Sequence, residues 1–108
     1  MVKSNDSLSS VYFALSDPTR RSILAYVSTV EMSIGEIVDK FKLSFAAISK
    51  HVTVLEHANL VKKQRRGKEK IIIFLPDAMT TAQLDIKQYT ALWGSRFDML
   101  EKVFKEEK

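Results

Sequence analysis

The sequence predicts a mainly α-helical domain of five helices, with a small two-stranded β-hairpin between the fourth and the fifth helix. Three observations support this fold class. Apolar residues recur at helical spacing in five segments, a helix-start signal follows closely after the third of these segments, and two strand-like runs meet at a loop that contains Gly67. Two helices joined by a short turn and followed by a hairpin are typical of a winged helix-turn-helix.

The first two helices are predicted by apolar spacing and by a cap. The apolar residues of the first helix are Leu8, Val11, Tyr12 and Leu15. We expect this helix to end at residues 16–18. Asp17 is suited to cap a second helix in which Pro18 occupies the first position, where a missing backbone N–H has no cost. The inner stripe of this helix consists of Ile23, Leu24 and Val27.

The third and fourth helices form the pair on which the functional prediction depends. Ser33 and Glu36 make a capping box, so we expect the third helix to begin there and to continue to about Lys42. Ser44 is a natural cap for the fourth helix, and the short turn between the two requires them to cross steeply. We call residues 44–58 the recognition helix.

The recognition helix has a buried stripe and an outer face that is nearly free of charge. The stripe consists of Ile48, Val52 and Leu55. The side chains left pointing outward are Phe45, Ala46, Ser49, Lys50 and Thr53. Small and hydroxylated side chains let a helix enter the major groove of DNA, where hydroxyls bond base edges and phosphates and apolar groups meet thymine methyls. Asn59 suits the left-handed conformation that would end this helix.

Residues 61–75 predict a β-hairpin with a cationic tip, which we call the basic wing. Its basic residues are Lys62, Lys63, Arg65, Arg66, Lys68 and Lys70. At this density they would face the phosphates of a nucleic acid, along the backbone or across the minor groove. The alternative is an edge strand that uses lysine to prevent aggregation.

The last helix begins at Pro76 and continues over about seven turns. Its apolar stripe consists of Ala82, Ile86, Tyr89, Trp93, Phe97, Leu100 and Phe104. A stripe of this length exceeds what a domain of 108 residues can cover alone, and aromatic residues are enriched at interface cores. We therefore expect part of it to pack against a second subunit. The alternative is that it covers the core of its own domain.

The positive charge is concentrated in the middle of the chain. The net charge is +4 and the isoelectric point is about 9.4. Residues 44–75 carry seven basic and two acidic groups, whereas the segments on either side are nearly balanced. The excess coincides with the recognition helix and the basic wing, so the partner that it predicts is double-stranded DNA. From the length we expect residues 1–108 to form one domain.

Several other function classes lack the residues that they require. The sequence has no cysteine, which excludes disulfides and thiolate metal sites. His51 and His57, the only histidines, would point to different faces of the recognition helix, so we expect no metal ion and no cofactor. We expect His51 to be a residue of the helix surface or a phosphate contact, and His57 to be a packing residue. No nucleophile–base pair or phosphate loop indicates an enzyme. Without a long apolar run or a secretory signal, we expect no membrane contact and a cytoplasmic location.

With these elements in order, the chain resembles the ArsR family of bacterial and archaeal transcriptional repressors over nearly its whole length. Besides the basic wing, two motifs carry the resemblance, FALSDPTRRSIL at residues 13–24 and SKHVTVLEHANLV at residues 49–61. The resemblance implies a homodimer, joined through its first and last helices, that binds a palindromic operator with paired recognition helices and wings. Repression would follow from occlusion of the polymerase.

The resemblance also assigns roles to particular residues. The base-facing positions would be Phe45, Ala46, Ala47, Ser49 and Lys50, with Thr53 on the same face. The phosphate contacts would come from Ser44, His51, Arg65, Arg66 and Lys68. The dimer interface would contain Leu8, Val11, Tyr12, Tyr89, Trp93, Phe97 and Leu100. The metal sensing of other family members uses cysteines on the third helix, or histidines and carboxylates on the last, and these ligand sets are missing here.

One alternative function remains open. The domain could instead be a winged-helix protein-interaction module whose long C-terminal helix binds a protein partner, with a basic wing that only increases solubility. The two functions differ in their dependence on salt, because phosphate binding releases counterions and weakens as the salt concentration rises. An apolar interface would be nearly indifferent to salt.

Overall fold

The computed structural model describes residues 3–106, and its description of side chains leaves out residues 3–6 and 95. The five predicted helices and the hairpin are confirmed, in the predicted order. The elements are α1 (Lys3–Leu15), α2 (Pro18–Val27), β1 (Met32–Ser33), α3 (Ile34–Phe41), α4 (Phe45–His57), β2 (Val61–Arg66), β3 (Glu69–Phe74) and α5 (Pro76–Glu106). Residues 3–106 thus form a winged helix-turn-helix in which α3 and α4 are the helix pair and β2 and β3 the wing.

The ends of the helices follow from local signals in the sequence. Asp17 caps α2 by accepting the N–H of Arg20, with Pro18 at the start of the helix. The expected capping box at the start of α3 is present in both directions. Asn59 is left-handed, with φ of 60°, just beyond the end of α4. By contrast, α1 begins at Lys3, earlier than Leu8 and its apolar partners indicate, because a polar turn carries no apolar periodicity.

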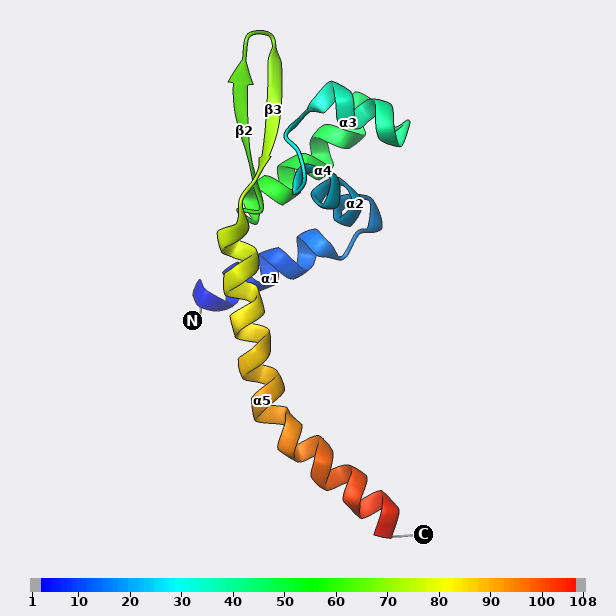
Figure 1. Ribbon diagram of the computed structural model, residues 1–108, viewed down its shortest axis with the longest axis vertical. Coiled ribbons are helices and arrows are strands. Elements are labelled where there is room, and N and C mark those ends of the chain that lie inside the picture. Colours follow the sequence, from blue (N-terminus) through cyan, green and yellow to red (C-terminus); the bar gives the residue numbers. More distant parts are fainter. Residues whose placement is uncertain (1–2, 107–108) are drawn as a thin grey trace.

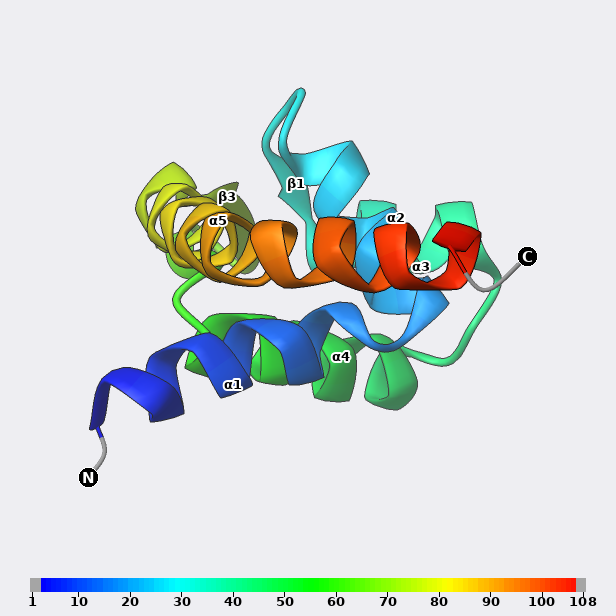
Figure 2. The ribbon, with the colours of Figure 1, turned by 90° about the horizontal axis from the view of Figure 1, so that it is seen from below.

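The core lies where the first four helices meet the base of the sheet. Figure 1 shows α2, α3 and α4 grouped beside the base of the wing, and Figure 2 shows α1 running along α4. The largest fully buried side chains of the core are Ile23, Ile37, Ile48, Val52, Leu55, Leu60, Val61 and Ile72. Burial of a side chain of this size contributes about 1.5–3 kcal/mol relative to its exposed state, so these residues hold α4 against the rest of the domain.

The sheet has three strands rather than the two that the sequence predicts. β3 is the central strand, and both β1 and β2 pair with it in antiparallel orientation. β1 pairs Met32 with Ile72 and Ser33 with Ile71. A strand of two residues is too short to show alternation, and its second residue, Ser33, is also the cap of α3, so only the helix signal is visible in the sequence. The additional strand attaches the base of the wing to α3.

α5 packs on the domain only at its beginning. Ala82 is buried, whereas the apolar residues beyond it are exposed, and the second half of the helix extends away from the other elements (Figure 1). The molecule is therefore elongated, with principal extents of 65 × 31 × 23 Å. Within residues 3–106, no helix has the length and the hydropathy that a membrane span requires.

Candidate nucleic-acid interface

α4 presents one face to the core and the other to solvent. Ser44 caps it, and the Ser44 hydroxyl accepts the N–H of Ala47 at 3.0 Å. Lys42, which is left-handed with φ of 55°, turns the chain sharply between α3 and α4. On the inner face, the fully buried residues are Ile48, Val52 and Leu55, as predicted. Their burial fixes the rotation of α4 about its axis and directs the opposite face outward.

The residues predicted to read bases differ in how far they reach into solvent. Exposed residues at the start of the helix and one turn later are Ser44, Phe45, Ala46 and Lys50. Half-buried residues are Ala47, Ser49, His51 and Thr53. The most accessible part of the outer face is therefore the first turn of α4 together with Lys50.

The wing places its cations at its free end. β2 and β3 pair from Val61 opposite Phe74 to Arg66 opposite Glu69, and Gly67, with φ of 63°, allows the tight turn between them. The three cations predicted to contact phosphates, Arg65, Arg66 and Lys68, are all exposed. They lie at the end of the hairpin that is farthest from α5 (Figure 1).

Arg66 already has an acidic partner in the protein. Its Nη2 lies 2.8 Å from Oε1 of Glu31, in the segment before β1, and the same atom donates to the side-chain oxygen of Gln64 at 3.3 Å. Both members of the ion pair are about half exposed, at 51% and 47% of their side-chain surface. A phosphate that contacts Arg66 must therefore compete with Glu31.

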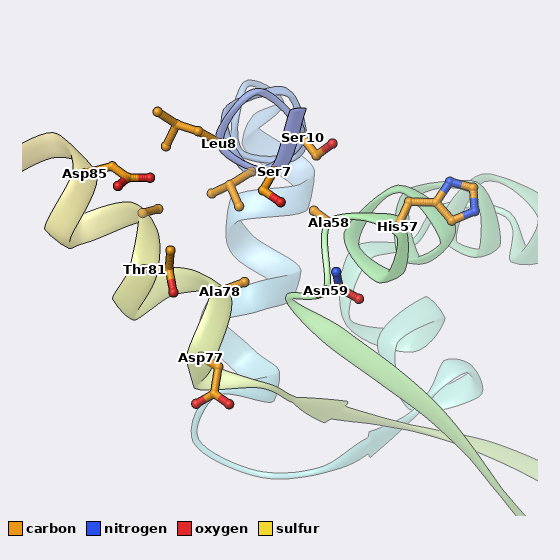
Figure 3. A pocket seen from close by; sticks show the side chains of 12 residues that line it. Ser7, Leu8, Ser10, His57, Ala58, Asn59, Asp77, Ala78, Thr81 and Asp85 are labelled. Atoms are coloured by element: carbon orange, nitrogen blue, oxygen red, sulfur yellow. The ribbon is translucent and has the colours of Figure 1, made fainter. Parts of the chain in front are cut away.

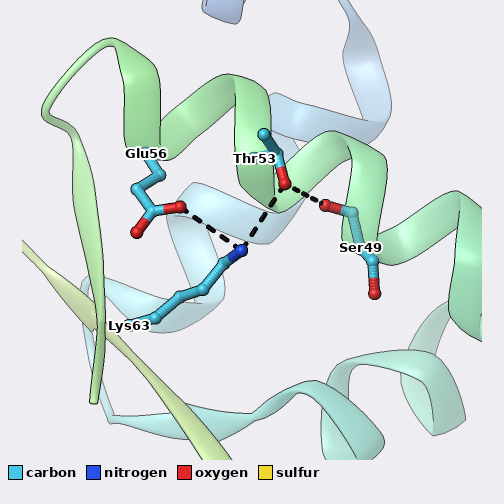
Figure 4. Close-up of polar contacts among 4 residues, drawn as sticks. All are labelled: Ser49, Thr53, Glu56 and Lys63. Carbon is cyan, nitrogen blue, oxygen red and sulfur yellow. Dashed lines mark hydrogen bonds and ion pairs between the residues drawn. The ribbon is translucent and has the colours of Figure 1, made fainter.

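Lys63 connects the wing to α4 (Figure 4). Its Nζ lies 3.3 Å from Oε1 of Glu56 and donates to Oγ1 of Thr53 at 3.5 Å. The Thr53 hydroxyl in turn donates to the carbonyl of Ser49 at 2.9 Å. The Thr53 hydroxyl thus both donates and accepts a hydrogen bond within the protein. Thr53 is therefore a weaker candidate for base contact than the residues in the first turn of α4.

Arg20 is a buried cation, only 9% exposed, that joins three helices. At the end of α1, its Nε donates to the carbonyl of Ala14 at 2.8 Å and its Nη2 to that of Phe13 at 3.0 Å. Its Nη1 lies 3.3 Å from Nδ1 of His51 on α4. Because a guanidinium only donates, this contact makes Nδ1 an acceptor, and the neutral imidazole then carries its proton on Nε2.

Asp17 lies beside this cluster. The backbone N–H of Arg20, 3.1 Å from the Asp17 carboxylate, is the main reason that the pKa of this carboxyl lies below its ordinary value, with a smaller contribution from His51. The cap of α2 is therefore strongest when Asp17 is ionised.

The residues predicted for the dimer interface fall into two groups. Exposed aromatic and aliphatic side chains are Tyr12 at 49%, Tyr89 at 49%, Trp93 at 43%, Phe97 at 63% and Leu100 at 53%. Leu8 is half-buried. The prediction was wrong for Val11, which is 4% exposed and packs in the core of its own protomer, because it lies on the side of α1 that contacts α2 and α4.

A cleft of about 410 Å³ lies between α1, the end of α4 and the start of α5 (Figure 3). Leu8 and Ala82 are among its apolar residues, and Asp77 and Asp85 among its polar ones. His57 borders the cleft and is exposed, so its prediction as a packing residue was wrong: its position turns it to the surface at the last turn of α4. Among the side chains that the structure describes, in residues 7–94 and 96–106, no three histidine or acidic groups gather as metal ligands would.

The sequence analysis missed the roles of three residues that shape the interface. It gave no contact for Arg20 and Glu31, and it expected Lys63 to face phosphates, whereas the structure pairs Lys63 with Glu56. The alternation along β2 carried a signal for one of them, because Lys63 shares a face with the buried Val61 and must point toward α4. Arg20 and Glu31 carried no such signal. Their partners, His51 and Arg66, are distant in the sequence, and only the assembled fold brings them together.

Comparison with known proteins agrees with this geometry. The model of a helix-turn-helix domain family matches residues 15–64. The chain is 37% identical over 60 residues to the transcriptional repressor SdpR of Bacillus subtilis. The aligned segment covers 56% of this chain and 67% of the repressor.

Two solved structures have the same fold. One is an ArsR-like transcriptional regulator from Rhodococcus, 26% identical, with a TM-score of 0.81 over 94% of this chain and 96% of that one. The other is the homodimeric winged helix-turn-helix DNA-binding domain of Mb0332 from Mycobacterium bovis, 21% identical, with a TM-score of 0.65 over 82% and 84% of the two chains.

The fold and its relatives define a winged helix-turn-helix transcriptional regulator that binds DNA and is not an enzyme. The motif around Asp17 spans the end of α1 and the start of α2, and the motif around His51 lies along α4, the helix whose outer face belongs to the interface. The chain belongs to the ArsR family of winged helix-turn-helix regulators.

Proposed function

We propose that the protein is a homodimeric repressor that binds a palindromic operator through the recognition helix (44–58) and the basic wing (61–75), within a single domain. One observation carries this proposal. The outer face of α4 has no acidic residue before Glu56, and it lies beside a hairpin whose exposed end carries Arg65, Arg66 and Lys68. A helix with such a face, next to a cationic hairpin, fits a major groove and the phosphates that border it.

The contacts divide by chemistry. The exposed start of α4 and Lys50 contact base edges, with Ala47, Ser49 and Thr53 on the margins of the same face. Ser44 and His51 contact phosphates beside the helix, and the wing cations contact phosphates farther along the backbone. Phosphate contacts position the protein, and contacts to base edges select the sequence.

The second subunit covers the apolar faces of α1 and α5. Its contacts on this protomer are Leu8 and Tyr12 on α1 and Tyr89, Trp93, Phe97 and Leu100 on α5. The rings of Trp93 and Phe97 stack with centroids 6.5 Å apart and an angle of 28° between their planes. Contiguous exposed apolar patches mark association sites, and the homodimeric state of Mb0332 supports the assignment of this patch to a dimer interface. The partner also covers the cleft between α1 and α5.

A dimer of this kind repeats its recognition helix by twofold symmetry, which matches a palindrome with half-sites about 34–36 Å apart. Binding to such a site near a promoter occludes the polymerase, and the role of SdpR as a transcriptional repressor supports this outcome. The protein acts where the chromosome lies, in the cytoplasm.

The test is quantitative binding to DNA at several salt concentrations. A labelled duplex selected from a random library, or taken from upstream of the chain's own gene, is titrated with wild type, Lys50→Ala and Lys68→Ala. We expect Lys68→Ala to weaken binding to all duplexes about equally and to reduce the salt slope by about one. Lys50→Ala reduces the preference for the operator.

Two outcomes contradict the proposal. Wild type that binds no duplex even in dilute buffer removes DNA as the ligand. Equal losses of specificity in both variants remove the division of roles between α4 and the wing. An affinity of α5 for another protein that does not depend on salt would then favour an interaction module.

A further inference from the structure

Phe45 is a large apolar side chain that the described part of the protein leaves uncovered. It is the first residue of α4, directly after the Ser44 cap, and 60% of its surface is exposed. The buried stripe of α4 starts only at Ile48, so Phe45 lies on the outer face, next to the small side chains of Ala46 and Ala47. More than half of this side chain therefore remains open to solvent in the isolated protomer.

The surroundings of Phe45 indicate what covers it. The ring borders a groove of about 260 Å³ between the start of α3 and the wing. The other residues of this groove are Ser33, Ile34, Gly35, Lys68, Glu69 and Lys70. Two lysines against one glutamate favour a polyanion at the rim, while the ring itself requires an apolar contact.

DNA supplies both features in the major groove. The phosphates match the lysines, and the C5-methyl group of thymine is the apolar group that the base edges present there. We propose that Phe45 is a specificity-determining residue that contacts the C5-methyl of one thymine in each operator half-site. This inference rests on the proposed function, because it requires α4 to enter the major groove.

The contact would add a preference for thymine over cytosine that does not depend on hydrogen bonds. Cytosine has a hydrogen at the position of this methyl group, so a ring packed against thymine loses an apolar contact when cytosine replaces it. Small neighbours such as Ala46 allow the ring to approach the base edge closely.

Replacement of thymine by deoxyuridine tests the contact, because it removes one methyl group and changes no hydrogen bond. Each thymine of the selected operator is replaced in turn, symmetrically in both half-sites, and the affinity is measured for wild type, Phe45→Ala, Phe45→Leu and Leu84→Ala. Leu84, which is 56% exposed on α5, is the control for loss of an exposed apolar side chain elsewhere. Circular dichroism checks that each variant is folded.

We expect one thymine per half-site at which wild type loses affinity about fourfold for each methyl group removed, since a buried methylene contributes about that factor. Leu84→Ala keeps this loss, Phe45→Leu keeps part of it, and Phe45→Ala binds both duplexes equally.

The inference is overturned if the affinity of wild type does not fall when any of the methyl groups is removed. It is also overturned if Phe45→Ala loses as much affinity as wild type when the methyl group is removed. In both cases tight binding to the unmodified operator leaves the proposed function standing. Wild type that binds no duplex overturns both the inference and the proposed function.

Discussion

At the scale of single residues, the sequence predicts caps and turns well and long-range polar contacts poorly. Asp17, Ser33, Ser44 and Asn59 all have their expected roles, because a cap depends on residues three or four positions away. Arg20 shows the limit. Its contacts with His51 and with the end of α1 depend on how three helices pack, and no local pattern encodes that arrangement.

Arg20 should determine the tautomer of His51. In wild type above pH 8 we expect nitrogen NMR shifts that place the proton of His51 on Nε2, because Nδ1 accepts from Arg20. Arg20→Met should leave a mixture of tautomers and should lower the free energy of unfolding by about 2 kcal/mol, because two carbonyls at the end of α1 lose their donor. His57, which is exposed on the same helix, is the internal control. An unchanged His51 spectrum in Arg20→Met would refute the contact.

Asp17 should make the stability of the protein sensitive to acid. Its pKa is lowered in the folded state, so its contribution is present above the ordinary carboxyl pKa near 4 and is lost as the pH falls through the lowered value. Asp17→Asn keeps a capping oxygen but does not titrate. We expect the difference in Tm between wild type and this variant to shrink from pH 6 to about pH 2.5. Parallel Tm curves over this range would contradict the assignment.

At the scale of elements, apolar periodicity predicts all five helices and the hairpin, and it misses β1. The hairpin was treated as a free two-stranded unit, whereas β1 and the Lys63–Glu56 pair attach it to α3 and α4. Short strands and ion pairs between elements leave no periodic trace. The consequence is functional, because a wing fixed to α4 presents its cations at a defined distance from the recognition helix.

The wing should bind DNA more tightly when Glu31 is neutralised. Glu31→Gln removes the partner of Arg66 and frees its guanidinium for phosphate, so we expect operator affinity to rise about threefold at low salt, with a steeper salt slope. Asp39→Asn, an exposed position on α3, is the charge-matched control. If both variants change affinity equally, the effect is one of net charge and the competition between Glu31 and phosphate is excluded.

At the scale of the whole molecule, α5 has an apolar face that a single protomer leaves largely exposed to solvent. The side chains that the structure describes in its second half leave the aromatic stripe exposed, and an unsupported helical segment of about 15 residues is marginal in water. The length of the apolar stripe correctly predicts that part of it stays uncovered by the protein's own domain. The sequence could not separate Val11 from Tyr12, because both fit the helical spacing of α1 and only packing decides which one faces the core.

Charge on the aromatic stripe should separate the subunits. Trp93→Glu places a carboxylate in the proposed interface, so we expect monomers in sedimentation and an operator affinity lower by at least about tenfold, since each half-site supplies only part of the contact energy. Leu84→Glu is the control, because at 100° per residue it lies on the opposite side of α5. A dimer that persists in Trp93→Glu would place the interface elsewhere.

The central claim is that two copies of α4 occupy successive major grooves on one side of the DNA. Hydroxyl-radical footprinting of the selected operator tests it most directly. The account predicts two protected patches on each strand, centred about one helical turn apart, with further protection by the wings that is lost in Lys68→Ala. A single patch, or protection that does not depend on the operator sequence, would contradict it.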